Sequence, residues 1–230
     1  MPVIVGANRR DAARRALDRF GVTAIVLDDG FQHRTLRKDL EVVTARATRP
    51  WGNARLLPGG PLREPLSALR RANLVVATGA HTSEDTADVA AAVADHAPRV
   101  PVLAARYVPT ESWESGTMRP VTVSGARVLA FAGIAHPSSF AESLQAADVR
   151  VDGFEVFPDH HWYRQAELRR LAGRAIALGV DGLVTTEKDW VRLRRLGALE
   201  PPLFVFGVRL ELVAGEAIWR AAFERACPPV

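Results

Sequence analysis

The sequence predicts an α/β fold with mostly parallel sheets, divided into two domains. Short apolar runs of strand length alternate with segments of helical periodicity, and the recurring order strand, helix, strand implies parallel pairing with right-handed crossovers. The 230 residues are 48% hydrophobic, which is enough for a substantial core. A polar segment without periodicity, residues 111–120, separates two such runs. We therefore place residues 1–115 in the first domain and residues 116–230 in the second.

The first run contains five strands and three helices. Residues 8–20 carry apolar side chains on one helical face, and Gly21 ends that helix. Residues 46–65 are rich in proline, glycine and arginine and predict a long loop, of a length that is usually functional or disordered. The predicted strands are residues 2–5, 23–27, 40–44, 74–78 and 100–107, and the other predicted helices are residues 66–71 and 82–97.

The second run repeats this order. Pro137, followed by Ser139 and Glu142 at the spacing of a capping box, predicts the start of a helix. Apolar residues between Leu168 and Ile176 recur at helical spacing and predict another. The predicted strands are residues 127–132, 149–156 and 182–185, followed by an extended segment at 203–212, and the remaining helices are residues 190–196 and 215–226.

Composition narrows the functional classes. Net charge is +4 with a pI near 9.9, which permits a phosphate-rich or anionic-lipid partner. No block of basic residues is interleaved with aromatics, so nucleic acid is not the expected partner. Cys227 is the single cysteine, which excludes a disulfide framework and favours a reducing cytosol. No apolar stretch is long enough to cross a bilayer, and no signal-peptide pattern is present.

Two adjacent carboxylates, Asp28 and Asp29, follow the predicted strand 23–27 directly. Ligands of open α/β sheets bind at the carboxyl ends of strands, and an apolar strand ending in aspartate is typical of the Walker B pattern that holds Mg²⁺ against nucleotide phosphates. Gln32 and His33 follow on the same loop and could contact a phosphate or orient a hydroxyl, although His33 alone favours a surface or hydrogen-bonded histidine. The alternative is a simple Asp-Gly turn between core elements.

The loop at residues 51–65 is the second candidate site. Its glycines allow close approach of a ligand to the backbone, and Arg55 and Arg63 could each bind phosphate oxygens in bidentate fashion. A proline-stiffened surface loop with solvated arginines explains the composition equally well.

Residues 157–163 form the third candidate, because an Asp-His pair can act as a proton acceptor. No further histidine or cysteine lies at ligand spacing, so a zinc site is not expected. The alternative is that Asp159 caps a helix. In the fourth candidate, residues 185–189, Asp189 is expected to cap the following helix.

A Walker B strand implies a phosphate-binding Gly-x-x-x-x-Gly-Lys-Ser/Thr loop earlier in the same sheet. No glycine in the 230 residues begins that pattern. A chain that opens inside an α/β pattern, one strand before a Walker B strand, favours loss of the first strand and the phosphate loop.

Five ordered motifs together resemble the tetraacyldisaccharide 4'-kinase family of lipid A biosynthesis. They are Asp-Asp-Gly-Phe-Gln-His at 28–33, Gly-Asn-x-Arg-Leu-Leu-Pro-x-Gly-Pro-Leu-Arg-Glu at 52–64, Phe-Ala-Gly-Ile-Ala-His-Pro-Ser-Ser-Phe at 131–140, Phe-Pro-Asp-His at 157–160 and Thr-Thr-Glu-Lys-Asp at 185–189. The match covers essentially the whole chain, while proteins of that family begin roughly a hundred residues earlier, an extent that suits a complete two-domain enzyme.

The resemblance implies a P-loop-kinase-like domain, here lacking its first strand and phosphate loop, and a smaller α/β domain, joined by linker strands near 104–108 and 206–212. It implies ATP- and Mg²⁺-dependent phosphorylation of the 4'-hydroxyl of a tetraacyl glucosamine disaccharide 1-phosphate, by a cytoplasmic protein peripheral to the inner membrane.

Site roles also follow from the resemblance. Asp28 and Asp29 would hold Mg²⁺, and Gln32 would lie near the nucleotide or the metal. Arg63 and Glu64 would belong to the active-site loop. The pair Asp159–His160 would assist the catalytic base, with His161 a weaker match for that role.

Without a phosphate loop, the 230-residue chain is expected to lack kinase activity. Two other functions stay open. One is a non-catalytic descendant that binds nucleotide or anionic lipid, and the other is a Mg²⁺-dependent phosphohydrolase that uses Asp28 and Asp29.

Overall fold

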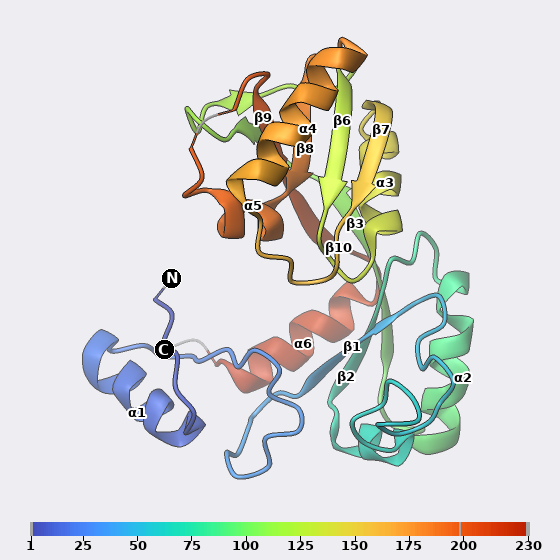
Figure 1. Cartoon of the computed structure of the whole chain (residues 1–230). Helices are drawn as coiled ribbons and strands as arrows, with labels where there is room; N and C mark the ends of the chain where they lie inside the picture. The colour runs from blue at the N-terminus through green and yellow to red at the C-terminus, as the bar shows by residue number, and fades with distance from the viewer. Residues whose placement is uncertain (1, 198, 229–230) are drawn as a thin grey trace. The chain divides into compact units, whose positions relative to one another are not determined.

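The computed structural model describes residues 2–197 and 199–228 (Figure 1). The chain forms two compact units, each with its own sheet. Unit 1 consists of residues 1–106 together with 212–230, and unit 2 consists of residues 107–211. Because unit 1 is made from both ends of the chain, unit 2 is an insertion within it.

This division differs from the predicted domains in two respects. Residues 107–115, which were expected in the first domain, belong to unit 2. The C-terminal helix α6 (Glu216–Ala226) belongs to unit 1, whereas residues 116–230 were all expected in the second domain. The reason is packing, because Ala222 of α6 is buried in one cluster with Leu74 and Leu103 of the unit 1 sheet. Periodicity identified the helix but carries no information about the sheet it covers.

The chain passes between the units within two strands. The first passage is at residues 106–107 in β3 (Val102–Pro109), and the second is at residues 211–212 in β10 (Val208–Ala214). β3 and β10 are hydrogen-bonded neighbours in one sheet. Both passages fall within the segments expected to be linker strands.

Unit 1 contains a four-stranded sheet in the order β1-β2-β3-β10. Strands β1, β2 and β3 pair in parallel, as the alternation of strands and helices predicted. The elements not yet bounded are α1 (Arg9–Phe20), β1 (Val42–Arg46), η1 (Leu66–Arg71), β2 (Leu74–Thr78), η2 (Glu84–Thr86) and α2 (Ala87–His96).

Both faces of the unit 1 sheet are covered. Val75 and Ala77 of β2 face a cluster that includes Val89 and Val93 of α2. Leu74 and Val76, which alternate with them, face the cluster of α6. A parallel strand buried on both faces needs a continuous apolar run, and this explains why β2 was predicted correctly.

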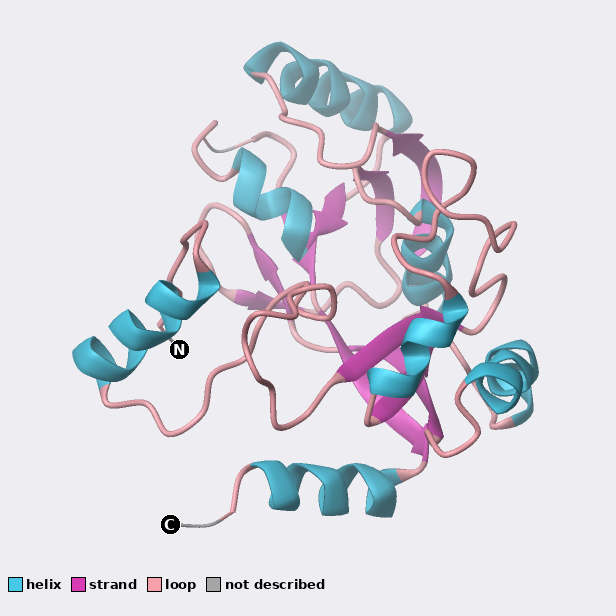
Figure 2. Ribbon diagram, turned by 90° about the horizontal axis from the view of Figure 1, so that it is seen from below, coloured by secondary structure: helices cyan, strands magenta, loops and turns pink. Residues whose placement is uncertain are grey.

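The two N-terminal strands predicted at residues 2–5 and 23–27 are wrong for the described residues. Neither segment is in a strand, Val26 is 84% exposed, and Figure 2 shows the chain between α1 and β1 as loop. An apolar run becomes a strand only where a neighbouring strand accepts its backbone hydrogen bonds. In the described sheet of unit 1, β1 is an edge strand and pairs with β2 alone.

Helix α1 forms for the local reasons read from the sequence. The Asn8 side chain accepts hydrogen bonds from the backbone N–H groups of Arg10 and Asp11, which caps the N-terminus. Gly21 ends the helix with φ of 56°, a conformation that glycine adopts without strain.

Unit 2 contains a six-stranded sheet in the order β5-β4-β9-β8-β6-β7. Strands β7, β6, β8 and β9 are parallel, and β4 pairs antiparallel with both β9 and β5. The elements are β4 (Ser112–Glu114), β5 (Pro120–Val121), β6 (Arg127–Ala132), α3 (Pro137–Ala146), β7 (Arg150–Val156), α4 (Gln165–Leu178), β8 (Gly182–Thr186), α5 (Glu187–Leu193) and β9 (Leu203–Phe206).

The order of these strands creates a topological switch point between β6 and β8. From β6 the chain moves through α3 to β7 on one side, and from β7 it returns through α4 to β8 on the other side. Accordingly α3 packs on one face of the sheet, while α4 and α5 pack on the opposite face (Figure 1). Ligand sites of open α/β sheets lie at the carboxyl ends of the strands at such a point.

The predicted capping box of Ser139 and Glu142 is wrong. Helix α3 begins three residues earlier than that box implies, with Pro137 at its first position and His136 as N-cap. The ring of proline is preorganised for the first helical position, so Pro137 rather than Ser139 determines the start. The Ser139 carbonyl oxygen instead accepts a hydrogen bond from the Ser143 hydroxyl at 2.8 Å.

A pH-dependent ion pair joins β7 to α4. Arg170 and Arg174 donate to the Glu155 carboxylate, and the hydrogen bonds from Arg170 hold the pKa of Glu155 below its ordinary value of 4.5. A lowered carboxylate pKa stabilises the fold above the unfolded-state pKa, and this contribution is lost as the pH falls through the folded-state pKa.

We therefore expect Glu155→Gln to lower the free energy of unfolding by about 1 kcal/mol at pH 7, and by progressively less below pH 4.5. Urea denaturation at a series of pH values measures the difference. Glu142→Gln, which alters an exposed glutamate on α3, is the control. A difference for Glu155→Gln that does not shrink in acid contradicts the assignment.

Candidate functional site

The two adjacent aspartates lie on an exposed turn of unit 1. We name residues 28–33 the aspartate loop. Asp28 and Asp29 are both exposed, and Asp29 has φ of 54°, a left-handed conformation that aspartate tolerates better than most residues. The aspartate loop lies between α1 and β1 and does not follow a strand in the described chain.

Side chains from distant positions hold the aspartate loop in place. The Arg63 Nη1 atom donates to Asp29 Oδ2 at 2.7 Å. Arg71 donates to the Phe31 carbonyl oxygen at 3.3 Å, and its guanidinium carbon lies 4.4 Å from the centre of the Phe31 ring. Arg71 also pairs with Glu64 at 2.5 Å. The structure therefore brings Asp29, Arg63 and Glu64 into one neighbourhood, although more than thirty residues separate the aspartate from the other two.

Gln32 and His33 complete the aspartate loop. Gln32 is exposed. The His33 Nε2 atom lies 3.1 Å from the Thr35 hydroxyl, which confirms the expectation of a hydrogen-bonded loop histidine. The Lys38 ammonium donates to the Gly30 carbonyl oxygen at 2.9 Å and so fixes the backbone next to both residues.

The aspartate loop fits a Mg²⁺ ion that takes much of its coordination from a substrate. Within the described residues, no group of three or more His, Cys, Asp or Glu residues could hold a metal ion. Mg²⁺ does not need one, because one or two carboxylates combined with phosphate oxygens and waters complete its octahedron. Asp28 is exposed, and in the described chain its carboxylate has no hydrogen-bond or ion-pair partner, so it is available for such binding.

The loop at residues 51–65 is ordered by its own backbone and side chains. The Asn53 side chain donates to the Gly59 carbonyl oxygen at 2.9 Å, and Leu57 N–H donates to the Leu62 carbonyl oxygen at 2.9 Å. Arg55, one of the two arginines proposed to bind phosphate, is exposed. Arg63 and Glu64 lie near the C-terminal end of this loop. Its closed conformation therefore positions Arg63, which contacts Asp29, and Glu64, which pairs with Arg71.

Gly60 is required by this closed conformation. A Cβ atom there would lie 2.1 Å from Asn53 Oδ1 and 2.4 Å from the Arg55 carbonyl oxygen, whereas at Gly59 the nearest atom would be 3.6 Å away. We expect Gly60→Ala to lower the free energy of unfolding by about 1–3 kcal/mol, and Gly59→Ala to change it little. Thermal denaturation of the two variants measures the contrast, and equal melting temperatures would contradict it.

In unit 2, Asp159 and His160 follow β7 and are both exposed. His160 has φ of 61°, and its backbone N–H donates to Asp159 Oδ1 at 2.9 Å and to the Gly133 carbonyl oxygen at 3.1 Å. The His160 Nε2 atom lies 3.7 Å from Asp159 Oδ2, which is too far for a hydrogen bond. Asp159 does not cap the next helix, because α4 begins at Gln165 with Arg164 as N-cap.

A buried carboxylate, Asp189, connects two of the sequence motifs, residues 131–140 and residues 185–189. It is fully buried and accepts hydrogen bonds from Gly133 N–H at 3.1 Å and from the Thr186 hydroxyl at 2.7 Å. Gly133 follows β6 and Thr186 ends β8, so Asp189 lies at the switch point of the sheet. The prediction that Asp189 caps α5 needs correction, because Thr186 is the N-cap and accepts from the Asp189 N–H at 3.1 Å.

Arg192 was not identified from the sequence. Its guanidinium pairs with Asp189 at 3.3 Å, donates to the Gly133 carbonyl oxygen at 3.1 Å, and lies 3.1 Å from the His160 Nδ1 atom. Asp189 and Arg192 are three residues apart on one helix, which is the only signal that the sequence offered. Asp189 and Arg192 reach Gly133 and His160 only because β6 and β8 are neighbours in the sheet.

His161 has a structural role. Its ring stacks on Phe157 with 4.8 Å between centroids, and its Nε2 atom lies 3.1 Å from both carboxylate oxygens of Glu167. Partial desolvation raises the pKa of Glu167, but the hydrogen bond from Arg164 N–H and the interaction with His161 outweigh it, so that pKa is lowered. Burial, with the Asp189 carboxylate nearby, raises the pKa of the Tyr163 hydroxyl. His161 therefore belongs to the packing around Tyr163.

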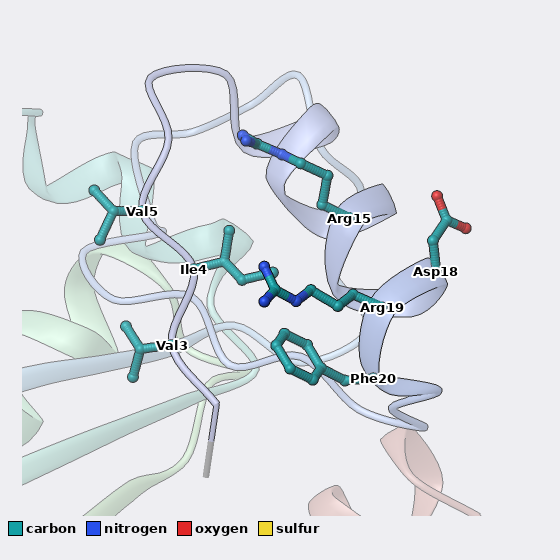
Figure 3. Close-up of a pocket in the computed structure, with 7 residues that line it drawn as sticks. All are labelled: Val3, Ile4, Val5, Arg15, Asp18, Arg19 and Phe20. Carbon is teal, nitrogen blue, oxygen red and sulfur yellow. The ribbon is translucent and has the colours of Figure 1, made fainter.

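A separate pocket of about 510 Å³ lies between the N-terminal segment and α1. Ile4 points toward the helix beside Arg19, while Val3 and Val5 point away from it (Figure 3). The pocket contains none of the predicted site residues. In the described chain, no helix is long and apolar enough to cross a membrane.

The family of the chain follows from comparison with known proteins. The family model described as Tetraacyldisaccharide-1-P 4'-kinase matches residues 1–227. The chain belongs to this family. Residues 1–227 include the aspartate loop, the loop at 51–65, and the cluster of His160, Asp189 and Arg192.

Relatives within the tetraacyldisaccharide 4'-kinase family support this assignment. A protein of that name from Anaeromyxobacter dehalogenans strain 2CP-C is 41% identical over 96% of this chain and 60% of its own length. Another from Syntrophus aciditrophicus is 34% identical over 92% of this chain and 60% of its own length. The chain therefore spans about three fifths of the length of these relatives.

A solved structure shares the fold. The crystal structure of LpxK from Aquifex aeolicus in complex with ATP has a TM-score of 0.63 at 24% sequence identity, and the match covers 95% of this chain and 62% of that one. This agreement confirms the α/β fold with mostly parallel sheets that the order of strands and helices predicted, and the P-loop-kinase-like class that the family resemblance implied.

Proposed function

We propose that this chain carries the metal-binding and base-assisting parts of an ATP-dependent kinase that phosphorylates the 4'-hydroxyl of a tetraacyl glucosamine disaccharide 1-phosphate. The observation that carries the proposal is the contact between Asp29 and Arg63 at 2.7 Å. It joins two of the family motifs that are 34 positions apart. The acceptor would be the lipid A disaccharide precursor at the cytoplasmic face of the inner membrane, where the enzyme would act as a peripheral protein.

Each proposed site residue has a chemical role in this reaction. Asp28 and Asp29 would hold Mg²⁺, which supplies charge neutralisation on the phosphate oxygens. Gln32 would lie near the nucleotide or the metal ion. Arg63 would keep Asp29 in place until phosphate oxygens compete for its guanidinium, and Glu64 would fix the loop through Arg71.

The Asp159–His160 pair of unit 2 would assist the catalytic base. Phosphoryl transfer to a sugar hydroxyl requires removal of the hydroxyl proton, and catalysis otherwise rests on positioning and charge stabilisation. An exposed imidazole held at its Nδ1 atom is suited to hydrogen bonding with the base or the acceptor oxygen.

Transfer of labelled γ-phosphate from ATP to the tetraacyl disaccharide 1-phosphate tests the proposal. We expect no transfer by the 230-residue chain, because it contains no Gly-x-x-x-x-Gly-Lys-Ser/Thr loop. We expect transfer by the same chain extended at its N-terminus with the phosphate-loop segment of a tetraacyldisaccharide 4'-kinase. An extended, folded chain that does not transfer phosphate would refute the function. Release of phosphate without the lipid acceptor would favour the phosphohydrolase alternative.

A further inference from the structure

We propose that Arg192 is a positioning residue that holds the imidazole of His160 as the neutral tautomer with its proton on Nε2. The catalytic consequence rests on the proposed function, whereas the tautomer itself does not. The starting observation is the 3.1 Å distance between Arg192 Nη2 and His160 Nδ1.

The chemistry of the two groups fixes the direction of this hydrogen bond. A guanidinium has five N–H donors and no acceptor, and it stays protonated in proteins. His160 Nδ1 must therefore accept, so the ring proton is on Nε2 and the ring is neutral. Protonation of Nδ1 would remove the bond and place a second cation against Arg192.

Arg192 is in turn fixed by buried partners. Its side chain is 15% exposed, and the Asp189 carboxylate that binds it is fully buried. The Gly133 carbonyl oxygen accepts from both Arg192 Nη1 and the His160 backbone N–H, at 3.1 Å each. Two contacts therefore fix His160 relative to the Gly133 carbonyl group. The His160 backbone N–H donates to it directly, and the Nδ1 atom is linked to it through Arg192.

The remaining ring nitrogen is free to act. The side chain of His160 is 79% exposed, and Nε2 lies 3.7 Å from the nearer Asp159 oxygen, beyond hydrogen-bond distance. A fixed, neutral N–H donor facing outward suits an anionic oxygen, either the carboxylate of a base or an oxygen of the substrate. His160 would then act by donating a hydrogen bond from Nε2, and Arg192 would ensure that Nε2 carries the proton.

Nitrogen NMR of the full chain with ¹⁵N-labelled histidine tests the tautomer directly. The chain has six histidines, and His160→Gln identifies the signals of interest by their loss. At pH 7 we expect a protonated Nε2 and an unprotonated Nδ1 in the unsubstituted protein. A protonated Nδ1 in that protein would overturn the inference without any variant of Arg192.

Variants of Arg192 then test the cause. Arg192→Ala should shift both ring nitrogens of His160 toward the average of a mixed population of tautomers, and Arg192→Lys, which keeps a donor, should shift them less. Arg195→Ala removes an exposed arginine just beyond α5 and should leave the His160 signals unchanged. Identical His160 signals in Arg192→Ala and the unsubstituted protein would show that Arg192 does not set the tautomer.

Turnover separates this inference from the proposed function. In the chain extended with a phosphate loop, we expect Arg192→Ala to lower kcat about tenfold with little change in KM, within the roughly 10²-fold that a positioned proton-transfer group contributes. If the extended chain is inactive but His160 has the Nε2–H tautomer, the proposed function fails and the role of Arg192 stands. If the extended chain is active but His160 carries its proton on Nδ1, the proposed function stands and the role of Arg192 fails.

Discussion

Replacement of Asp189 by alanine is expected to lower the free energy of unfolding of unit 2 by about 3–5 kcal/mol, which is the cost of removing one partner from a buried ion pair. The fully buried carboxylate accepts from Gly133 N–H and the Thr186 hydroxyl and pairs with Arg192. Without it, a mostly buried guanidinium, a buried backbone N–H and a partly buried hydroxyl lose their partner. Urea denaturation followed by circular dichroism measures the loss.

Glu187→Ala is the matched control for Asp189. Glu187 lies in the first turn of the same helix, α5, but it is exposed. Its removal should change the unfolding free energy by no more than about 1 kcal/mol, the size of an exposed charge effect at a helix N-terminus. Similar losses for both variants would mean that Asp189 contributes only as a helix-end charge and does not hold the switch point together.

The second large effect is expected at Asp28. In the chain extended with a phosphate loop, Asp28→Asn should reduce the rate of phosphoryl transfer by about 10²–10³-fold, the usual range for loss of one electrostatic stabiliser of the transition state. Since Asp28 is exposed and its carboxylate has no partner in the described chain, the same substitution should leave the melting temperature unchanged. Asp28→Asn is therefore expected to lower the rate of phosphoryl transfer without lowering the stability of the protein.

Asp95→Asn provides the control for Asp28, because Asp95 is an exposed aspartate of unit 1 on α2. It should change neither the rate nor the melting temperature. If Asp28→Asn retains the full rate while Mg²⁺ is limiting, the assignment of Asp28 as a metal ligand is wrong. If it unfolds the protein, Asp28 has a structural role instead.

The sequence predicted elements well where a single segment contains all the information. Strand β2 is buried on both faces and was recognised from its continuous apolar run. Helix α1 was recognised from its apolar face and Gly21. Residues 23–27 have a similar apolar composition, yet they form no strand, because strand formation depends on a hydrogen-bonding neighbour that a local pattern does not specify.

For the candidate site, likewise, the sequence indicated the residues whose motif lies within a single segment. The motifs identified Asp28, Asp29 and Arg63 as chemically suited side chains, and the structure adds the ion pair between Asp29 and Arg63. Arg192 could not be recognised in this way. Arg192 follows β8 and His160 follows β7, and the two meet because both strands lie beside β6. The order of strands in a sheet is a property of the whole unit.

The insertion of unit 2 into unit 1 has a practical consequence for evolution and for protein engineering. Residues 107–211 begin and end on two neighbouring, hydrogen-bonded strands, β3 and β10. A segment whose ends are adjacent can be excised with one new peptide bond between residues 106 and 212. It can also be exchanged for the equivalent segment of a homologue, with two new peptide bonds that lie close together. Truncation from the C-terminus, by contrast, would first remove α6 and thereby uncover one face of the N-terminal sheet.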